Sequence, residues 1–217
     1  MWVAEKIYYR GNDNYVRAYQ GSEIVWDKNS NSMIFYTSTD NTVVRPYNSS
    51  SFGGRSIVSN TNVNGQGVMV FDGTLTVIGY NAFMERHKLA TVVIPETITE
   101  IGQGAFWECI SLSSINLPEG LLIIRLDAFN DVEVMETITI PSTVTSIGAA
   151  AFADCLSLRE VIVNAVTPPV MDVSVDQNYH QFDNNGSGRL IKVPSGSVQA
   201  YKTAAGWSKY ASSIVSQ

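Results

Sequence analysis

The chain has 217 residues, of which 45% are hydrophobic and 16% charged, and its formal net charge is −6. This composition is typical of a folded protein with a sizeable core and excludes a disordered chain. Because no cluster of Lys and Arg accompanies the acidic net charge, we expect no binding to nucleic acid.

The N-terminal segment, residues 1–31, lacks the apolar stretch of a signal peptide. Either a signal peptide has been removed, or Met1 is the native start and export takes another route. Three runs here are rich in aromatic and β-branched residues: Lys6–Tyr9, Tyr15–Tyr19 and Glu23–Trp26. Turn-forming residues separate them, so we expect a small β-meander.

Residues 32–74 are rich in Ser, Asn and Gly, and we expect an N-terminal cap with long loops. Within it, Met33–Tyr36 and Thr42–Val44 have the composition of strands. Met69–Asp72 lies 23 residues before the strand-like segment Val92–Pro95, and the same interval separates the repeats that follow. We therefore expect it to be a degenerate first strand of the repeats that follow.

Residues 75–163 repeat the phrase Ile-Gly-x-x-Ala-Phe at a constant 23-residue interval, starting at Ile78, Ile101, Ile124 and Ile147. Self-similarity at such a period is typical of a stacked-repeat solenoid. Each copy also contains a segment of the type Val-x-Ile-Pro, in which Asn164 replaces the proline of the last copy; its alternation predicts a strand that the proline ends. The expected inward positions are apolar in every copy: Leu89, Leu112, Met135, Leu158; Val92, Ile115, Ile138, Val161; Ile94, Leu117, Ile140, Val163; Ile98, Leu121, Val144.

The C-terminal segment, residues 164–217, should hold a capping repeat and a helix. Ile191–Pro194 reproduces the end of a repeat strand but follows Val161–Asn164 by more than one repeat length, which indicates an insertion of seven residues. We expect the loop Pro168–Gly188 to absorb this insertion.

A helix is expected over Val198–Ala205, with Ser195 or Ser197 as its N-cap and Gly206 ending it. Bulky apolar residues follow and should seal the last strand: Trp207, Tyr210 and Ile214.

The two cysteines, Cys109 and Cys155, hold the same position in two repeats that are separated by one other. Strands in a sheet lie about 4.7–4.9 Å apart, so the two Cα atoms should be roughly 9–10 Å apart. A disulfide requires less than about 7 Å. We therefore expect two buried thiols, in a column that Val132 shares.

The pattern Leu-x-x-Val-x-Ile-Pro…Ile-Gly-x-x-Ala-Phe-x-x-Cys resembles the BspA-type leucine-rich repeats of bacterial surface proteins, and Val193–Lys202 resembles the C-terminal caps of that family. The resemblance is clearest over residues 75–163 and extends more weakly from about residue 32 to the C-terminus. It implies a mostly β chain with short helices, folded as a right-handed leucine-rich-repeat solenoid with terminal caps.

The same resemblance implies non-catalytic recognition or adhesion by a cell-surface or secreted protein, with a protein or a glycan as partner. The alternative is a structural or assembly module, such as a spacer or a phage-like surface component, without a ligand of its own. No stretch of the chain is long and apolar enough to insert into a membrane.

No residue pattern indicates catalysis. His87 and His180 lack partners at a fixed spacing, and no nucleophile elbow, phosphate loop or zinc spacing is present. Asp183–Gly188 has the composition of a calcium loop but lacks its alternating ligands and distal Glu, so we expect a turn. We predict that the chain is not an enzyme and needs neither a cofactor nor a metal.

Candidate partner-binding residues lie on the outer face of the predicted strands. Because Val92 and Ile94 point inward, the residues between and before them point outward. We name the outward set the strand strip: Thr91, Val93, Ser114, Asn116, Thr137, Thr139, Glu160 and Ile162. It is small, nearly uncharged and rich in hydroxyls, so it could dock an extended polar partner or a glycan; the alternative is an idle solvated face.

The third repeat departs from the pattern. Arg125 replaces the glycine of the other copies, which would cost roughly 1 kcal/mol or more if that glycine has a positive φ. Leu122, Ile123 and Leu126 replace mainly polar residues. We name these three residues the apolar patch, and two interpretations stay open: a surface for a partner or second copy, or local repacking.

Trp107 occupies a column that holds Met84, Asn130 and Ala153 in the other repeats, so we expect it to be partly exposed. An exposed Trp can stack on a sugar ring or anchor a protein interface. The alternative is packing against the adjacent turn.

Overall fold

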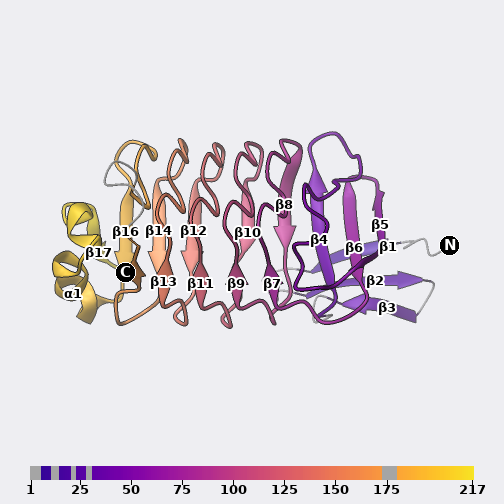
Figure 1. Cartoon of the computed structure of the whole chain (residues 1–217), viewed down its shortest axis with the longest axis horizontal. Helices are drawn as coiled ribbons and strands as arrows, with labels where there is room; N and C mark the ends of the chain where they lie inside the picture. The colour runs from indigo at the N-terminus through magenta and orange to yellow at the C-terminus, as the bar shows by residue number, and fades with distance from the viewer. Residues whose placement is uncertain (1–5, 11–14, 21–22, 28–30, 173–179) are drawn as a thin grey trace.

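The computed structural model describes residues 6–10, 15–20, 23–27, 31–172 and 180–217, and it describes side chains in the last two ranges. The chain is a mostly β solenoid whose coils stack in a row, with antiparallel strands at one end and short helices at the other (Figure 1). The predicted fold class is thereby confirmed.

Each coil contributes one longer strand to one side of the solenoid. Within the repeats, the first strand pairs in parallel with the second, and the third with the fourth, at the 23-residue step, so that Ile115 faces Val92 and Val161 faces Ile138. These strands are β8 (Leu89–Val93), β10 (Ser114–Asn116), β12 (Thr137–Ile140) and β14 (Glu160–Val163), and β16 (Leu190–Val193) follows them in the C-terminal cap.

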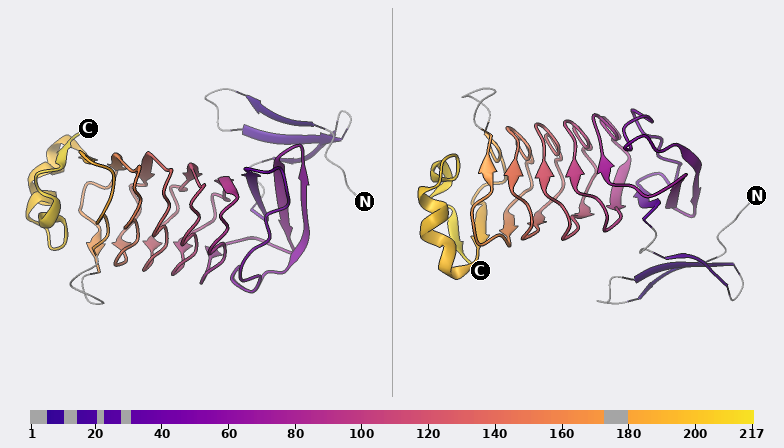
Figure 2. Two further views of the ribbon diagram at one scale, coloured as in Figure 1. Left: turned by 90° about the horizontal axis from the view of Figure 1, so that it is seen from above. Right: turned by 60° about the horizontal axis from the view of Figure 1, so that its bottom comes forward.

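A second parallel sheet of two-residue strands runs along another side, as Figure 2 shows. Its five strands are β7 (Val77–Ile78), β9 (Glu100–Ile101), β11 (Ile123–Ile124), β13 (Ser146–Ile147) and β15 (Val170–Met171). The isoleucine that opens each repeat phrase is the buried residue of its strand. The repeat phrase therefore marks the point where each coil joins the second sheet.

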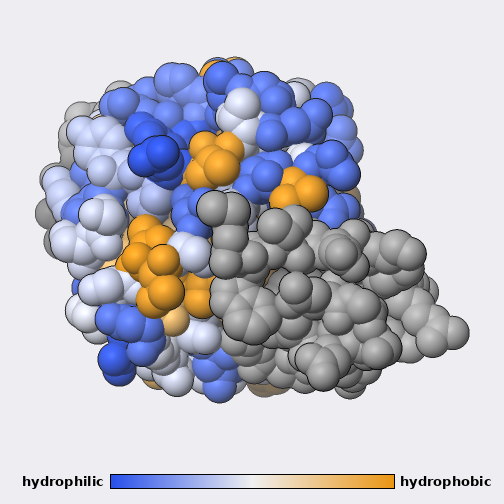
Figure 3. Space-filling view, turned by 90° about the vertical axis from the view of Figure 1, so that its right-hand side faces the viewer, coloured by the Kyte–Doolittle hydropathy of each residue, from blue (hydrophilic) through white to orange (hydrophobic). Residues whose placement is uncertain are grey.

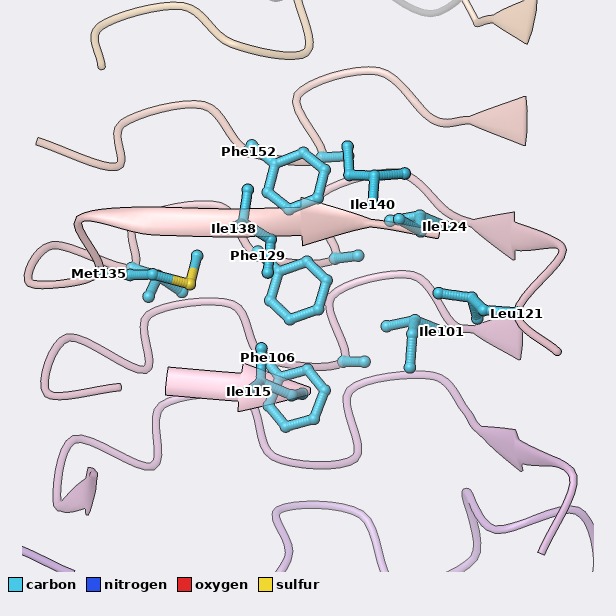
Figure 4. Close-up of a cluster of buried hydrophobic side chains, with 14 of the residues drawn as sticks. Ile101, Phe106, Ile115, Leu121, Ile124, Phe129, Met135, Ile138, Ile140 and Phe152 are labelled. Atoms are coloured by element: carbon cyan, nitrogen blue, oxygen red, sulfur yellow. The ribbon is translucent and has the colours of Figure 1, made fainter. Parts of the chain in front are cut away.

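The core between the sheets is built from the predicted inward columns. All of these side chains are buried except Leu117, which is partly buried. The phenylalanines of the repeat phrase stack nearly parallel with ring centroids 5.2–5.4 Å apart, from Phe83 through Phe106 and Phe129 to Phe152. Figure 4 shows the last three of these rings. Because one repeat equals one coil, identical residues stack on one another and the core is continuous.

Two turn positions in each coil have left-handed backbone. The first, just before Ala-Phe, holds Asn81, Gly104, Asp127 and Ala150, with φ between 50° and 61°. The second, two positions after the phenylalanine, holds Glu85, Glu108, Asp131 and Asp154, with φ between 55° and 60°. Asn, Asp and Gly tolerate this conformation best, which explains their frequency here but not the two glutamates.

The N-terminal cap departs from the predicted order of strands. Met69–Asp72 does lie largely in a strand, β6 (Gln66–Phe71), but the expectation that it starts the parallel stack is wrong. β6 pairs antiparallel with β4 (Met33–Ser38) and β5 (Ile57–Val63), and β4 lies between β6 and β8. Tyr36 of β4 covers Gly67, and it also faces Val92, so a strand from outside the repeats closes this end.

The predicted strand Thr42–Val44 is also wrong, since the segment has no strand structure. Val44 is buried and its backbone groups bond to side chains: its N–H donates to the Tyr36 hydroxyl at 3.2 Å, and its carbonyl accepts from Asn60 Nδ2 at 2.9 Å. These bonds satisfy the buried backbone groups of Val44, which would otherwise need a neighbouring strand as partner.

At the N-terminus, β1 (Lys6–Arg10), β2 (Tyr15–Gln20) and β3 (Glu23–Asp27) pair in order as an antiparallel meander. The predicted runs of this segment therefore correspond to its three strands.

At the other end, β16 follows β14 after a step longer than one repeat, with Ile191 facing Val161. Met171 follows its partner Ile147 by one residue more than the repeat step, so only a small part of the insertion precedes β15. The rest lies between Met171 and Phe182, whose ring stacks on Phe152. Residues 173–179 of the predicted loop lie outside the described residues.

The C-terminal helix is shorter than predicted and its cap differs. It runs as a 3₁₀ turn, η1 (Ser195–Ser197), into α1 (Val198–Thr203), and neither start has a side-chain cap. The predicted serine caps are therefore wrong: Ser197 is buried and donates instead to the Val166 carbonyl at 2.7 Å. The expected sealing residues are buried in η2 (Trp207–Tyr210) and in an additional parallel strand, β17 (Ile214–Ser216).

Candidate recognition surfaces

The strand strip lies on the outer face of the longer strands, as expected. Its residues alternate with buried ones and form rows, because Thr91 faces Ser114 and Val93 faces Asn116, while Thr137 faces Glu160 and Thr139 faces Ile162. Thr37 of β4 extends the first row, with its hydroxyl 2.7 Å from that of Thr91. Lys192 of β16 ends the strip in an ion pair with Glu160.

The strand strip is not one continuous sheet. The strands belong to two sheets, which separate between β10 and β12, although these strands are neighbours in the stack (Figure 1). Among the described residues, no backbone hydrogen bond joins the two strands, whereas the second sheet continues unbroken from β9 through β11 to β13. An extended ligand on the strip would therefore cross a seam.

The apolar patch lies on the other sheet and reaches solvent. Leu122 is 44% exposed, and Ile123 and Leu126 are half-buried. On either side of Ile123 in the second sheet stand Glu100 and Ser146, the polar residues of the adjacent coils. The three side chains are thus a surface feature, and the interpretation as mere repacking leaves Leu122 unexplained.

Arg125 borders the apolar patch and makes a bidentate ion pair with Glu100. Its Nε lies 2.5 Å from Oε1 and its Nη2 lies 3.0 Å from Oε2. The condition for backbone strain at Arg125 is not met, because the glycines of this column, Gly79, Gly102 and Gly148, have no positive φ. Close approach of the neighbouring coil explains the glycine at position 148 instead, because a Cβ on Gly148 would lie 2.2 Å from the Leu126 nitrogen.

Trp107 is half-buried and lies in the turn that follows the stacked phenylalanine, outside both sheets. Met84 holds the same position in the preceding coil, where Arg86 Nε donates to the Met84 carbonyl at 3.1 Å. Arg86 also lies 5.5 Å from the ring centroid of Tyr47, which is 50% exposed. Sequence reasoning missed Tyr47 because its loop is outside the repeat register; the Tyr47 N–H donates to the Ala82 carbonyl and so places it here.

The candidate residues therefore do not converge on one site. The strand strip belongs to the longer strands, the apolar patch to the second sheet, and Trp107 to the connecting turn.

The reactive side chains have structural roles. Cys109 and Cys155 are free and buried as predicted, and each thiol donates to the carbonyl of a stacked phenylalanine, at 3.0 and 3.1 Å. Burial raises the pKa of both thiols to about 12, so neither is a nucleophile at neutral pH. In the described part of the chain, no three His, Cys, Asp or Glu side chains gather in a way that could hold a metal.

The segment Asp183–Gly188 is a turn, as predicted. Asn184 has φ 54° and donates to Asp154 at 2.8 Å, while Asn185 donates to the Phe152 carbonyl at 2.7 Å. Asp183 pairs with Lys209 at 3.0 Å. These polar side chains bind the last coil to its neighbours. No helix in the described ranges is long and apolar enough to cross a membrane.

Comparison with known families gives one match, over residues 68–168, to the BspA type leucine-rich repeat region in six copies. The leucine-rich repeat protein TpLRR of T. pallidum is 24% identical, with a TM-score of 0.50 over 67% of this chain and 64% of that chain. This likeness shows the fold, and less than two thirds of that protein's length is spanned.

Two further solved structures show weaker likeness. A leucine-rich cell surface protein from Faecalibacterium prausnitzii A2-165 is 26% identical, with a TM-score of 0.39 over 52% of this chain and 37% of that one. A leucine-rich repeat protein from Bacteroides ovatus ATCC 8483 is 16% identical, with a TM-score of 0.35 over 87% and 59%. No curated protein matches the chain.

Proposed function

Residues 68–168 are a BspA-type leucine-rich repeat region, and from this premise we propose that the chain is a non-catalytic recognition module of a bacterial cell surface. The proposed ligand is a protein, bound through the apolar patch of Leu122, Ile123 and Leu126. The repeat family supports a scaffold typical of bacterial surface proteins, while the choice of ligand and of surface rests on the geometry of this chain.

One observation carries the proposal: a leucine stands exposed where the repeat otherwise places a hydroxyl. The residues aligned with Leu122 in the other coils are Thr76, Thr99 and Thr145, and Leu122 is 44% exposed. Exposing apolar area costs free energy, about 25 cal/mol for each Å². Exposed apolar residues beside a charged rim, here Arg125 and Glu100, have the anatomy of a protein interface.

The test restores the repeat sequence. A double variant, Leu122→Thr with Ile123→Ser, copies Thr145 and Ser146 of the next coil and should fold as well as the parent. Parent and variant are applied to an array of extracellular-matrix proteins and glycans. We expect the parent to bind a protein on the array and the variant to lose at least tenfold in affinity, equal to about 1.4 kcal/mol.

Val166→Thr is the matched control, because it removes an exposed valine from a site away from the second sheet. It should bind like the parent. Unchanged binding of the double variant would overturn the proposal for this patch. Binding to a glycan, with loss on Trp107→Ala alone, would move the site to the turn. Binding to nothing on the array would favour a structural module.

A further inference from the structure

In the described part of the chain, the sheet at the N-terminal end of the solenoid finishes in strand β5, which pairs only with β6. Natural edge strands usually carry Lys, Pro or a bulge that blocks pairing with another chain. β5 reads Ile-Val-Ser-Asn-Thr-Asn-Val and has neither a charge nor a proline, while its one bulge lies at its start, between Ile57 and Ser59. Residues 59–63 are therefore a regular, neutral edge. The opposite end is different, since α1 and η2 follow β16 and precede the last strand, β17.

The turn between β5 and β6 identifies which backbone groups point outward. Asn64 and Gly65 have φ of 51° and 84°, as in the two-residue turn of type I′. In such a hairpin the flanking pair, Val63 and Gln66, is hydrogen-bonded, and pairs then alternate along the ladder. The N–H and C=O groups of Asn60 and Asn62 therefore point away from β6. In the described part of the chain, no backbone group beyond β6 bonds to them.

The side chains of Asn60 and Asn62 form hydrogen bonds within the chain, and these bonds hold β5 in place. Asn60 Nδ2 donates to the Val44 carbonyl at 2.9 Å, and Asn62 Nδ2 donates to the Thr42 carbonyl at 3.1 Å. On the other face of β5, Ser59, Thr61 and Val63 are exposed. An edge that is ordered before binding loses little conformational entropy when a strand pairs with it. Figure 3 views this end, where hydrophobic patches interrupt a mainly hydrophilic surface.

The edge is complementary to itself. When two β5 strands run antiparallel with Asn60 of each facing Asn62 of the other, all of their outward backbone groups are paired and Thr61 faces Thr61. The other two symmetric registers fail. With the two-fold axis at Asn60, Asn62 of one copy would face the bulge at Val58 of the other. With the axis at Asn62, Asn60 of one copy would face the turn at Asn64 of the other. Within β5 no charged residue opposes its own copy, because the strand contains none.

We propose that two copies of this chain associate edge to edge through β5, about a two-fold axis at Thr61. The interface is isologous: each strand donates and accepts the same hydrogen bonds. The two solenoids then extend in opposite directions from a joined sheet, and the apolar patch takes no part. A recognition module of this kind would be bivalent.

Cross-linking tests the register directly. In this register the two Thr61 Cα atoms are about 4.5 Å apart, within reach of a disulfide, so Thr61→Cys should form a covalent dimer under mild oxidation. Ser59 faces Val63 of the second copy, so Ser59→Cys and Val63→Cys should cross-link when mixed but not alone. The native thiols give no background, because both are buried with a raised pKa.

Sedimentation of the full chain over a range of concentrations supplies the second measurement. The parent should dimerise reversibly, and Thr61→Lys should remain monomeric because two ammonium groups would face each other. Gln199→Lys, which adds the same charge on exposed α1, should dimerise like the parent. A parent that is monomeric throughout, or a Ser59→Cys variant that cross-links alone as well as Thr61→Cys does, would overturn the proposal.

Discussion

Ala150 is the one apolar side chain among the left-handed turn residues of the described chain, with φ 50°. Left-handed backbone costs a non-glycine residue roughly 1–2 kcal/mol, while the buried methyl group returns about 0.8 kcal/mol. Ala150→Gly should therefore stabilise the protein by about 0.5 kcal/mol, measured by urea unfolding. The adjacent Ala151 is buried without a positive φ, so Ala151→Gly should cost about 1 kcal/mol. Destabilisation by both variants would show that Ala150 is unstrained.

Asp131, in the second left-handed turn position, should make the stability of the protein depend on pH. Its pKa is raised, mainly by burial and then by the carboxylates of Glu133 and Asp154. A raised pKa in the folded state means that folding is favoured by protonation: the contribution is present at acid pH and is lost as pH rises through the raised pKa. Asp131→Asn should therefore be more stable than the parent at pH 7, and Asn keeps the tolerance for left-handed backbone.

The comparison at two pH values is its own control. Below the ordinary Asp pKa of about 3.9, the parent carboxyl is protonated and the advantage of Asp131→Asn should vanish. An equal advantage at both pH values would assign the effect to turn conformation and not to charge.

Among the elements, the coils approach one another most closely at the glycine column. A Cβ on Gly148 would lie 2.2 Å from the Leu126 nitrogen, which is backbone and cannot swing aside. Gly148→Ala should therefore destabilise the protein by about 1–3 kcal/mol in thermal or urea unfolding. Gly196→Ala is the matched control, because nothing lies within 4 Å of its added Cβ, and it should change stability by less than about 0.5 kcal/mol. A neutral Gly148→Ala would show that the coils can separate without cost.

Elements inside the repeat were predictable, since the constant spacing predicts both the strands and the pairing of Val92 with Ile115 and of Ile138 with Val161. The cap was not, because the pairing of Tyr36 with Val92 joins residues far apart in sequence that share no repeat. β17 was missed because a strand of three residues after a helix shows no alternation. The first left-handed position holds Asn, Gly, Asp and Ala in turn, so no single residue marks that column.

The candidate surfaces were predictable only as exceptions to the repeat. Leu122 was found because three aligned threonines make a leucine conspicuous. Its exposure, and the separation of the patch from the strand strip, depend on which side of the coil each segment occupies. The β5 edge carries no sequence motif, because its significance lies in having β6 on only one side.

For the whole molecule, the stacked rings show how a repeat becomes a continuous scaffold. The stack runs from Phe83 to Phe182; Phe52 lies edge-on to Phe83 at one end, and Phe182 contacts Trp207 and Tyr210 of the C-terminal cap at the other. Such a core fixes the outer surfaces in place without contributing chemistry of its own. We therefore propose that recognition resides at Leu122, Ile123 and Leu126, where the repeat is broken.

Hydroxyl-radical footprinting can locate the binding surface, because it labels exposed Leu, Ile and Trp side chains individually. The chain is labelled alone and with the protein that it binds most strongly on the matrix array. We expect labelling of Leu122, Ile123 and Leu126 to fall in the complex while labelling of Trp107 is unchanged. Protection of Trp107 or of the strand strip, with the apolar patch still labelled, would contradict this proposal.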